Sequence, residues 1–358
     1  MLIASIVCLI GIAAQAAAPF QDLAARATAA REANDVPHAI ELYKQSVDLN
    51  PRWEEGWWYL GSLLYDSDQY AAGRDALKHV VQIDAKAAPA WALLGLCEFE
   101  TGEYSTSLDD IRRAFAQQLD PQMESVLHYH EALLLTRLGR FDEAVKAYTW
   151  FVSRGVKNPE LMVAFGLAAL RTPRLPKEVA GDPQRFALAG QAAYLTMLRD
   201  YKDANETFDH LLQAFPRAHY VHYLYGCFLL AAKPDEAMAE LRRELEITPA
   251  SGAANAMLAW VLLERGDTDA ARPYARAAAA QDPSLPLAQY VWGRSLLEDG
   301  KVNVSIEHLQ LAEQRDPSNI ETHMSLATAY SKSARPLDAR RERLQTLEML
   351  RANAHENP

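Results

Sequence analysis

Short apolar runs alternate with polar turns along most of this chain of 358 residues. Residues 57–65, with the sequence WWYLGSLLY, form one such run, and the polar residues 66–69 follow it directly. Further along, the polar turn 264–268 precedes residues 270–280, AARPYARAAAA, in which small apolar and charged residues share one segment. Runs of this length, each bounded by a turn, predict helix–turn–helix pairs along the chain.

The predicted helical pairs repeat every 34 residues. Four pairs of identical residues in the N-terminal part have this separation: Trp57 and Trp91, Leu60 and Leu94, Gly61 and Gly95, and Tyr70 and Tyr104. In the C-terminal part Pro249, Pro283 and Pro317 repeat the interval, and a small residue precedes each proline by twelve positions. Because four residue types share one spacing, the period indicates repeated structural units.

This pattern resembles the tetratricopeptide repeat family, which has Trp, Leu-Gly and Tyr in a first helix, followed by Ala, an aromatic residue and Pro. The resemblance implies an all-α fold, a right-handed solenoid of about nine to ten helix-turn-helix repeats with one irregular interruption. The clearest repeats start at Phe20, Glu54, Ala88, Ser125, Arg185, His219, Gly252, Pro286 and Ile320. Each pair leaves an apolar face that only its neighbours cover, so the repeats must stack.

One interruption divides the predicted array. Residues 159–184 begin with a first-type helix whose Gly166 corresponds to Gly61, but the prolines that follow preclude a regular second helix. We therefore expect four repeats over residues 20–158, a single helix with a proline-rich connection over 159–184, five repeats over 185–353 and a disordered tail over 354–358. The connection is either an irregular part of one continuous solenoid or a mobile hinge at residues 172–184.

The first 18 residues form a segment of a different kind. Residues 2–18 contain no charged side chain, and the first Lys or Arg is Arg26. An apolar centre followed by the small-x-small residues 14–16 is typical of a signal peptide cleaved after Ala16. We therefore expect residues 1–18 to be a signal peptide, the protein to be periplasmic or secreted, and the mature chain to lack a membrane span. Because the positively charged region that usually begins a signal peptide is missing, an uncleaved N-terminal membrane anchor is the alternative.

Composition and the absence of known motifs argue against several kinds of partner and of active site. The 47 acidic and 36 basic residues give a net charge of −11, which repels nucleic acid. Three cysteines without a CxxC pair cannot make a disulfide framework or a cysteine zinc site. The usual hydrolase, nucleotide-binding and zinc-protease motifs are absent from the sequence, and His219 and His222 lack a third converging ligand. We predict no catalytic residue, no metal site and no cofactor, hence a protein that is not an enzyme.

The first helices carry an excess of aromatic residues on one face. In the tetratricopeptide family, the second, fifth, ninth and twelfth residues of the first helix form a stripe that lines a concave groove. At the chain's aromatic frequency of 9%, about four of the forty stripe positions would be aromatic, whereas nine are. The nine are Trp58, Tyr65, Phe99, Tyr129, Phe186, Tyr220, Tyr223, Trp260 and Tyr290. Of these, Trp58, Tyr129, Tyr223 and Tyr290 occupy the fifth position, which points most directly into the groove.

The predicted function is that of a protein–protein interaction scaffold whose concave groove binds a peptide or protein segment. The Lys and Asn residues with which some members of the family bind C-terminal carboxylates are missing, since the fifth and ninth positions hold, for example, Trp58 and Ser62. A small-ligand or glycan receptor that uses the same aromatic residues is the alternative function. Equally, these aromatic residues can be ordinary core residues that pack against the next helix. The sequence does not identify the partner.

Overall fold

The structure is a computed structural model that describes residues 19–356. Every regular element among these residues is a helix, which confirms the predicted all-α fold. None of the described helices is long and apolar enough to cross a membrane. The predicted signal peptide at residues 1–18 lies outside the described residues and stays a prediction. Residues 357–358 of the predicted disordered tail lie outside the described residues, and residues 354–356 continue the last helix, α20 (Pro336–Glu356).

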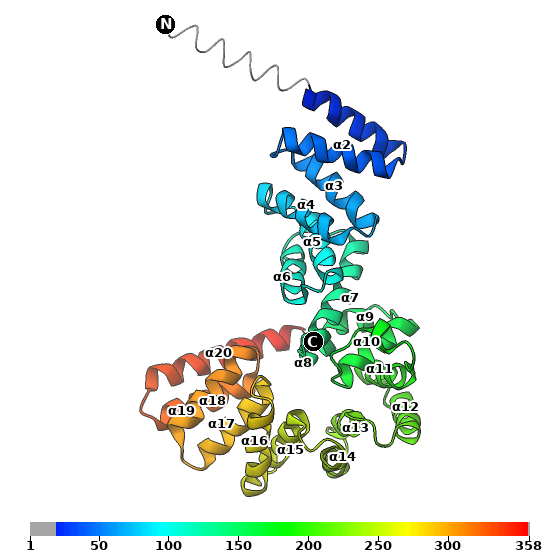
Figure 1. Cartoon of the computed structure of the whole chain (residues 1–358). Coiled ribbons are helices and arrows are strands. Elements are labelled where there is room, and N and C mark those ends of the chain that lie inside the picture. The colour runs from blue at the N-terminus through cyan, green and yellow to red at the C-terminus, as the bar shows by residue number, and fades with distance from the viewer. Residues whose placement is uncertain (1–18, 357–358) are drawn as a thin grey trace. The chain divides into compact units, whose positions relative to one another are not determined.

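The chain divides into two compact units, with the boundary after Leu198 (Figure 1). Unit 1 contains a helix over residues 19–32, then α2 (Val36–Leu49), α3 (Glu54–Asp66), α4 (Tyr70–Ile83), α5 (Ala88–Glu100), α6 (Tyr104–Phe115), α7 (Pro121–Arg137), α8 (Phe141–Ala147), α9 (Thr149–Ser153), α10 (Pro159–Ala169), the 3-10 helix η1 (Pro176–Val179) and α11 (Gln184–Met197). Unit 2 contains α12 (Tyr201–Ala214), α13 (Val221–Leu229), α14 (Pro234–Ile247), α15 (Gly252–Glu264), α16 (Thr268–Gln281), α17 (Pro286–Glu298), α18 (Val302–Arg315), α19 (Ile320–Lys332) and α20 (Pro336–Glu356).

Neighbouring helices pack as pairs, and the pairs stack on one another. The pairs are α3 with α4, α5 with α6, α7 with α8, α13 with α14, α15 with α16, α17 with α18, and α19 with α20. Five of the predicted repeat starts, Glu54, Ala88, Gly252, Pro286 and Ile320, are the first residues of first helices. First helices also contact each other directly, as α3 contacts α5 and α5 contacts α7. This packing confirms the predicted solenoid of helix-turn-helix repeats.

Small residues let the two helices of a pair approach closely. The Ser107 hydroxyl donates to the Gly95 carbonyl at 2.7 Å, and the Ser305 hydroxyl donates to the Gly293 carbonyl at the same distance. A Cβ added at Gly95 would lie 2.7 Å from the Ile111 side chain. The close contact therefore excludes a side chain at this place, which explains why small residues recur there.

The turn between successive repeats is held by a recurring hydrogen bond, which we call the turn clasp. A side-chain N–H in the first turn of a first helix donates to the backbone carbonyl six residues earlier. In unit 1 the donors are indoles, Trp57 to Pro51 and Trp91 to Ala85, both at 2.9 Å. In unit 2 the bonds are His222 to Pro216 at 2.9 Å, Gln289 to Pro283 at 2.9 Å and His323 to Pro317 at 3.0 Å. The clasp satisfies a turn carbonyl that helical hydrogen bonds do not reach.

Helices α10 and α11 form a pair that the sequence did not predict. A Cβ at Gly166 would lie 1.8 Å from the Phe186 carbonyl oxygen, and one at Gly190 would lie 1.9 Å from that of Met162. The two backbones are therefore in direct contact. We expected α10 to lack a partner and α11 to open the five-repeat run, but α11 packs as the second helix of α10. Residues 159–184 consequently belong to unit 1, and the division between the two units comes after α11.

The connection between α10 and α11 is packed against unit 1. Leu175 and Val179 are buried, and the Glu178 carboxylate accepts from the Leu175 N–H at 2.7 Å. Arg137 of α7 donates to the Pro173 carbonyl at 2.9 Å. These contacts favour the irregular connection over the mobile hinge at residues 172–184, which stays a hypothesis for proteolysis to test.

Candidate functional site

The nine predicted groove aromatics fall into two groups by burial. Five are half-buried and keep an open edge: Trp58, Tyr65, Tyr129, Tyr220 and Trp260. Four are buried among other side chains: Phe99, Phe186, Tyr223 and Tyr290. Phe186 is buried because it belongs to the backbone contact between α10 and α11. Tyr290 is 4% exposed, and its hydroxyl accepts from Arg294 at 3.2 Å. A binding role for any of the nine stays a prediction. The five half-buried rings are partly exposed in the folded protein, so a ligand can contact them without any unfolding.

In unit 1 the structure brings several of these side chains together across successive first helices. The Phe99 ring of α5 lies edge-on to the His130 ring of α7, with centroids 4.9 Å apart. Tyr129 and His130 are also edge to face, at 5.8 Å. Tyr65 of α3 is half-buried. Burial raises its pKa, and the charge of Glu100 of α5 contributes to the same shift. We call the group formed by Trp58, Tyr65, Tyr129, His130, Glu160 and the buried Phe99 the first-helix face of unit 1.

A hollow of about 250 Å³ opens beside Tyr129. Its walls come from α7, from α9 with the turn that follows it, and from the start of α10, and they include Phe151, Val156 and Leu161. The Tyr129 hydroxyl donates to the Glu160 carboxylate at 2.9 Å across the mouth. Burial, together with this hydrogen bond, raises the pKa of Tyr129 above its usual range. The hollow thus combines an apolar wall with one carboxylate.

His130 forms the inner edge of this hollow as a neutral ring. Its Nδ1 lies 2.8 Å from the Val126 carbonyl oxygen, which can only accept, so Nδ1 carries the hydrogen. Burial lowers the pKa of His130, although Glu100 and Glu160 act in the opposite direction. At neutral pH the other ring nitrogen is therefore an acceptor. The site presents acceptors, namely a carboxylate and an imidazole nitrogen, beside aromatic surface.

A lysine in the connection between α10 and α11 pairs with a carboxylate of α5 near this face. Lys177 of η1 lies 3.9 Å from the Glu100 carboxylate and is largely exposed. The pair joins the connection between α10 and α11 to α5. At this distance and exposure the attraction is weak and is screened by salt. A basic side chain of a ligand can therefore compete with Lys177 for Glu100.

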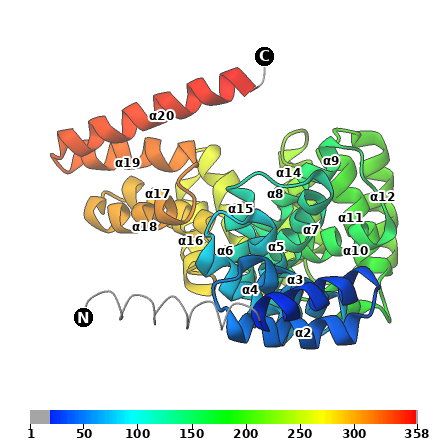
Figure 2. The same cartoon turned by 90° about the horizontal axis from the view of Figure 1, so that it is seen from above.

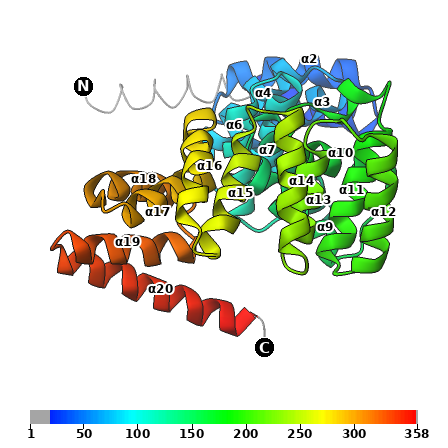
Figure 3. The ribbon, with the colours of Figure 1, turned by 90° about the horizontal axis from the view of Figure 1, so that it is seen from below.

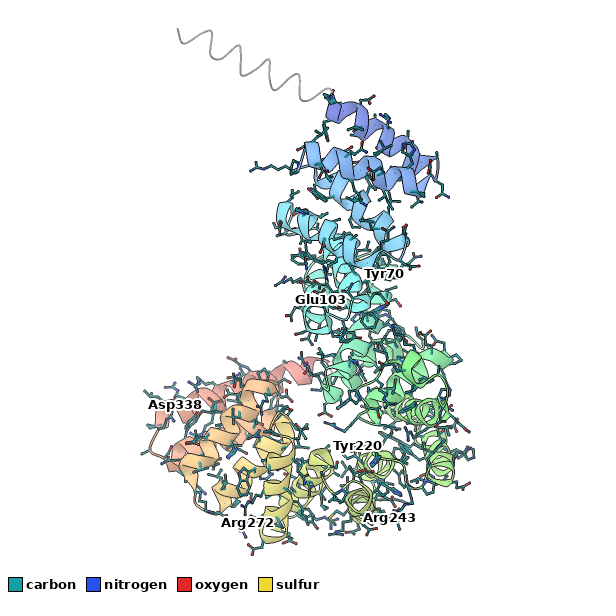
Figure 4. All side chains as sticks on the ribbon, viewed as in Figure 1. Tyr70, Glu103, Tyr220, Arg243, Arg272 and Asp338 are labelled. Atoms are coloured by element: carbon teal, nitrogen blue, oxygen red, sulfur yellow. The ribbon has the colours of Figure 1, made fainter. Side chains whose placement is uncertain are left out.

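Unit 2 has its own aromatic pair at the start of α13. Tyr220, labelled in Figure 4, has a left-handed backbone with φ of 65°. The Tyr220 and Tyr223 rings meet edge to face with centroids 5.9 Å apart. The buried Glu244 carboxylate accepts from the Tyr220 N–H at 2.8 Å and from the Tyr223 N–H at 3.3 Å. Glu244 thereby caps the helix, so this pair is fixed mainly by interactions within the fold.

A second hollow, of about 410 Å³, lies at the C-terminal end of unit 2. It is lined by Met324 and Ala327 of α19 and by Thr346 and Leu347 of α20, with Arg343 as its charged residue. Figures 2 and 3 show α20 running beside α19 and continuing past it. Leu344, Leu347 and Leu350 are exposed along α20. This is the face that a further repeat would cover in a longer array.

Sequence reasoning missed the polar residues of the unit 1 site. Glu160 is the second residue of α10 and reaches Tyr129 over 31 positions of sequence, a separation that no repeat interval marks. The contact of His130 with Phe99 depends on the stacking of α5 on α7. The sequence pattern that could have identified Glu160 is the stripe of first-helix positions, because Glu160 is the second residue of α10 and therefore belongs to that stripe.

Comparison with known proteins places the repeats in a described family. A family model described as tetratricopeptide repeat matches residues 24–88, 129–194 and 256–320, which together make up more than half of the chain. The second matched region ends in α11, so it includes the α10–α11 pair.

Individual proteins match parts of the chain. Anaphase-promoting complex subunit 3 of Dictyostelium discoideum is 28% identical over 89 residues, which are 25% of this chain and 9% of that protein. The chain thus spans less than a tenth of this curated relative. Among solved structures, MamA from Desulfovibrio magneticus RS-1 is 19% identical, with 47% of this chain and 96% of that chain covered and a TM-score of 0.39. YrrB, described as a TPR protein with an unusual peptide-binding site, is 16% identical over 48% of this chain and 90% of its own, with a TM-score of 0.37.

Proposed function

Because the chain belongs to the tetratricopeptide repeat family, whose folds are typically non-enzymatic scaffolds for protein–protein interaction, we propose that it binds an extended segment of a partner protein on the first-helix face of unit 1. The observation that carries the proposal is the hollow beside Tyr129, with aromatic surface on one side and the Glu160 carboxylate on the other. Pockets that combine apolar walls with a few polar groups are typical binding sites.

The chemistry of the site favours a segment with an apolar side chain next to a basic one. The apolar side chain would enter the hollow against Phe151 and Leu161. A Lys or Arg would approach Glu160 and Glu100, in agreement with the net charge of −11. Tyr129 would act as the anchor, because tyrosine is among the residue types that dominate binding energies at interfaces.

The test compares Tyr129 with a tyrosine outside the face. Tyr129→Ala is expected to weaken binding to an array of extended peptides carrying an apolar residue beside Lys or Arg, by about 1–3 kcal/mol, measured by fluorescence polarisation. Tyr201, which is 58% exposed on α12, supplies the control variant Tyr201→Ala, which should bind like the parent protein. Glu160→Gln should reduce the preference for basic peptides.

Three outcomes would contradict the proposal. Equal binding by Tyr129→Ala and Tyr201→Ala would remove the site from this face. Loss of binding that follows only from a large fall in melting temperature would make Tyr129 a core residue. Stabilisation by members of a glycan library, without any peptide bound, would favour the alternative receptor function.

Export is part of the same proposal. It is supported by the apolar sequence of residues 2–13 and the small residues that follow it. N-terminal sequencing of the protein recovered from the periplasm or medium should begin at Ala17. Recovery of the full-length chain in the membrane fraction would establish the uncleaved anchor instead.

A further inference from the structure

Three ligand-type side chains from the last three helices of unit 2 converge at one place. Glu313 of α18, His323 of α19 and Glu342 of α20 offer one nitrogen and two carboxylate oxygens, all within 4.8 Å of one another. His323 and Glu342 are fully buried, and the Glu313 side chain is 26% exposed. Among the described residues this is the one group of three or more such side chains with ligand spacing.

The hydrogen bonds of His323 direct one ring nitrogen toward the two carboxylates. Nε2 donates to the Pro317 carbonyl at 3.0 Å in the turn clasp. Nδ1 lies 2.8 Å from Glu342 Oε2 and 3.8 Å from Glu313 Oε1. Metal-ligating histidines commonly donate their other N–H to a carbonyl, which fixes the ring and leaves the first nitrogen free to bind.

Glu313 is the residue that the fold alone does not explain. In earlier repeats the corresponding residue of the second helix is apolar, as in Val81, Leu212, Leu245 and Ala279. Glu313 makes no hydrogen bond with a described residue, since its 3.8 Å separation from Nδ1 is too long for one. Burial and the nearby Glu342 carboxylate raise the pKa of Glu313, so a second carboxylate here carries an electrostatic cost.

We propose that Glu313, His323 and Glu342 bind a divalent transition-metal ion of the Zn²⁺ type, which joins α18, α19 and α20. Bonds of about 2.1 Å in a tetrahedral site place ligand atoms about 3.4 Å apart, and the separations of 2.8 and 3.8 Å lie on either side of this value. Solvent would supply the remaining ligand on the partly exposed side of Glu313. One imidazole with two carboxylates suits Zn²⁺ better than Mg²⁺, which prefers oxygen ligands throughout.

The alternative occupant of the same place is a proton. A protonated His323 between the two carboxylates, with Arg341 at 2.8 Å from Glu342, gives a balanced cluster without a metal ion. The same arrangement without a second carboxylate occurs in the clasp of His222, where Glu240 and Pro216 are the partners. The two clasps therefore differ in Glu313, and this difference can be tested.

The experiment titrates the chelator-treated full chain with Zn²⁺, and with Co²⁺ for its visible spectrum, using Mg²⁺ as comparator. One equivalent of Zn²⁺ is expected to saturate the protein and raise its melting temperature. Co²⁺ should give absorption bands of low-coordinate nitrogen and oxygen ligation. Glu313→Gln keeps the side-chain shape and should raise the Kd for Zn²⁺ at least about tenfold. Glu307→Gln, an exposed carboxylate on the same helix, is the matched control and should bind like the parent protein.

These measurements distinguish a bound metal ion from a protonated His323. Absence of saturable Zn²⁺ binding, or equal binding by Glu313→Gln and the parent protein, would overturn the metal site and leave the protonated cluster. Glu313→Gln should keep the melting temperature of the metal-free parent protein within a few degrees, so that loss of binding cannot be attributed to unfolding. Glu342→Gln serves as a second variant and should also lose Zn²⁺ binding.

Discussion

The turn clasp is made differently in the two units of the molecule. In unit 1 the donor is the indole of Trp57 or Trp91, whereas in unit 2 it is His222, Gln289 or His323. The bond lengths differ by no more than 0.1 Å, and the acceptor is always the carbonyl six residues earlier. One structural task is therefore performed by three types of side chain.

The difference lies in what the donor requires from the rest of the repeat. An indole has one polar atom, and once it is bonded the ring needs only surface to pack on. Trp57 accordingly stacks on His79 at 4.0 Å. Imidazole and amide groups have a second polar atom that must also be satisfied when buried. In unit 2 the second helix provides it, through Glu240 for His222 at 2.6 Å and His308 for Gln289 at 2.7 Å.

The largest expected effect comes from removing one member of a buried pair in unit 2. His222→Leu leaves Oε2 of the buried Glu240 carboxylate without its imidazole partner, while Arg243 still pairs with Oε1, and should lower the free energy of unfolding by about 3 kcal/mol. Urea unfolding followed by circular dichroism measures this loss, and hydrogen exchange should localise it to α13 and α14.

A double variant provides the control for this effect. His222→Leu combined with Glu240→Leu replaces both polar groups with apolar ones and should recover part of the lost stability. If the double variant is no more stable than His222→Leu, the cost comes from packing and not from the carboxylate oxygen that lost its imidazole partner.

The next largest expected effect is a pH dependence of the unfolding free energy in unit 1, where a carboxyl group is buried without an imidazole partner. Glu98 occupies a position that holds Leu64, Leu262 or Leu296 in other repeats, and its carboxylate oxygens have no hydrogen-bond partner in the structure. Burial, with a further contribution from the Asp110 charge, raises the pKa of Glu98 to about 8. The folded state thus holds this proton more tightly than the unfolded state, where the pKa is near 4.5.

The sign follows from this raised pKa. Unfolding free energy should be highest below about pH 4.5 as far as Glu98 is concerned, and should fall as pH rises through 8. Glu98→Gln should therefore raise the melting temperature at pH 9 relative to the parent protein, with little difference at pH 5. Melting temperatures at pH 5, 7 and 9 measure it. An unchanged difference across this range would show that Glu98 titrates normally.

The smallest expected effect is the loss of a clasp in unit 1. Trp57→Phe removes the N–H that donates to Pro51 and keeps most of the ring surface. Because Pro51 is exposed, water can take over its carbonyl, and the unfolding free energy should fall by only about 1 kcal/mol. A loss in Trp57→Phe as large as that in His222→Leu would break the comparison between the two units.

Much of the fold could be predicted because repeats make their contacts at a constant sequence interval. Trp57 and Trp91 lie 34 residues apart and perform the same bond, so identity of residue revealed the period. The same position holds His222, Gln289 and His323 in unit 2, where the residue type varies and the prolines mark the period instead. The equivalence of these side chains became visible only through their common acceptor, the turn carbonyl.

The candidate site was predicted less completely. The stripe rule identified Tyr129, which lines a hollow, but it treated Phe186 and Tyr290 in the same way although both are buried. Phe186 was assigned to a first helix because the prolines after α10 suggested that α10 had no partner. The pairing of Gly166 with Gly190 spans an irregular connection, and a sequence period cannot register contacts across a segment of unusual length.

The sequence by itself determined the helical repeats, five of the nine predicted starting residues and the family, because these depend on local periodicity and on contacts between neighbours in sequence. Tertiary structure alone decided which aromatic edges stay open, which helix pairs with α10, and which carboxylates meet Tyr129 and His323. The carboxylate contacts of Tyr129 and His323 join residues between 10 and 31 positions apart on different helices. Their side chains meet only after stacking fixes the distance between the helices, and that distance depends on packing, which no interval along the chain records.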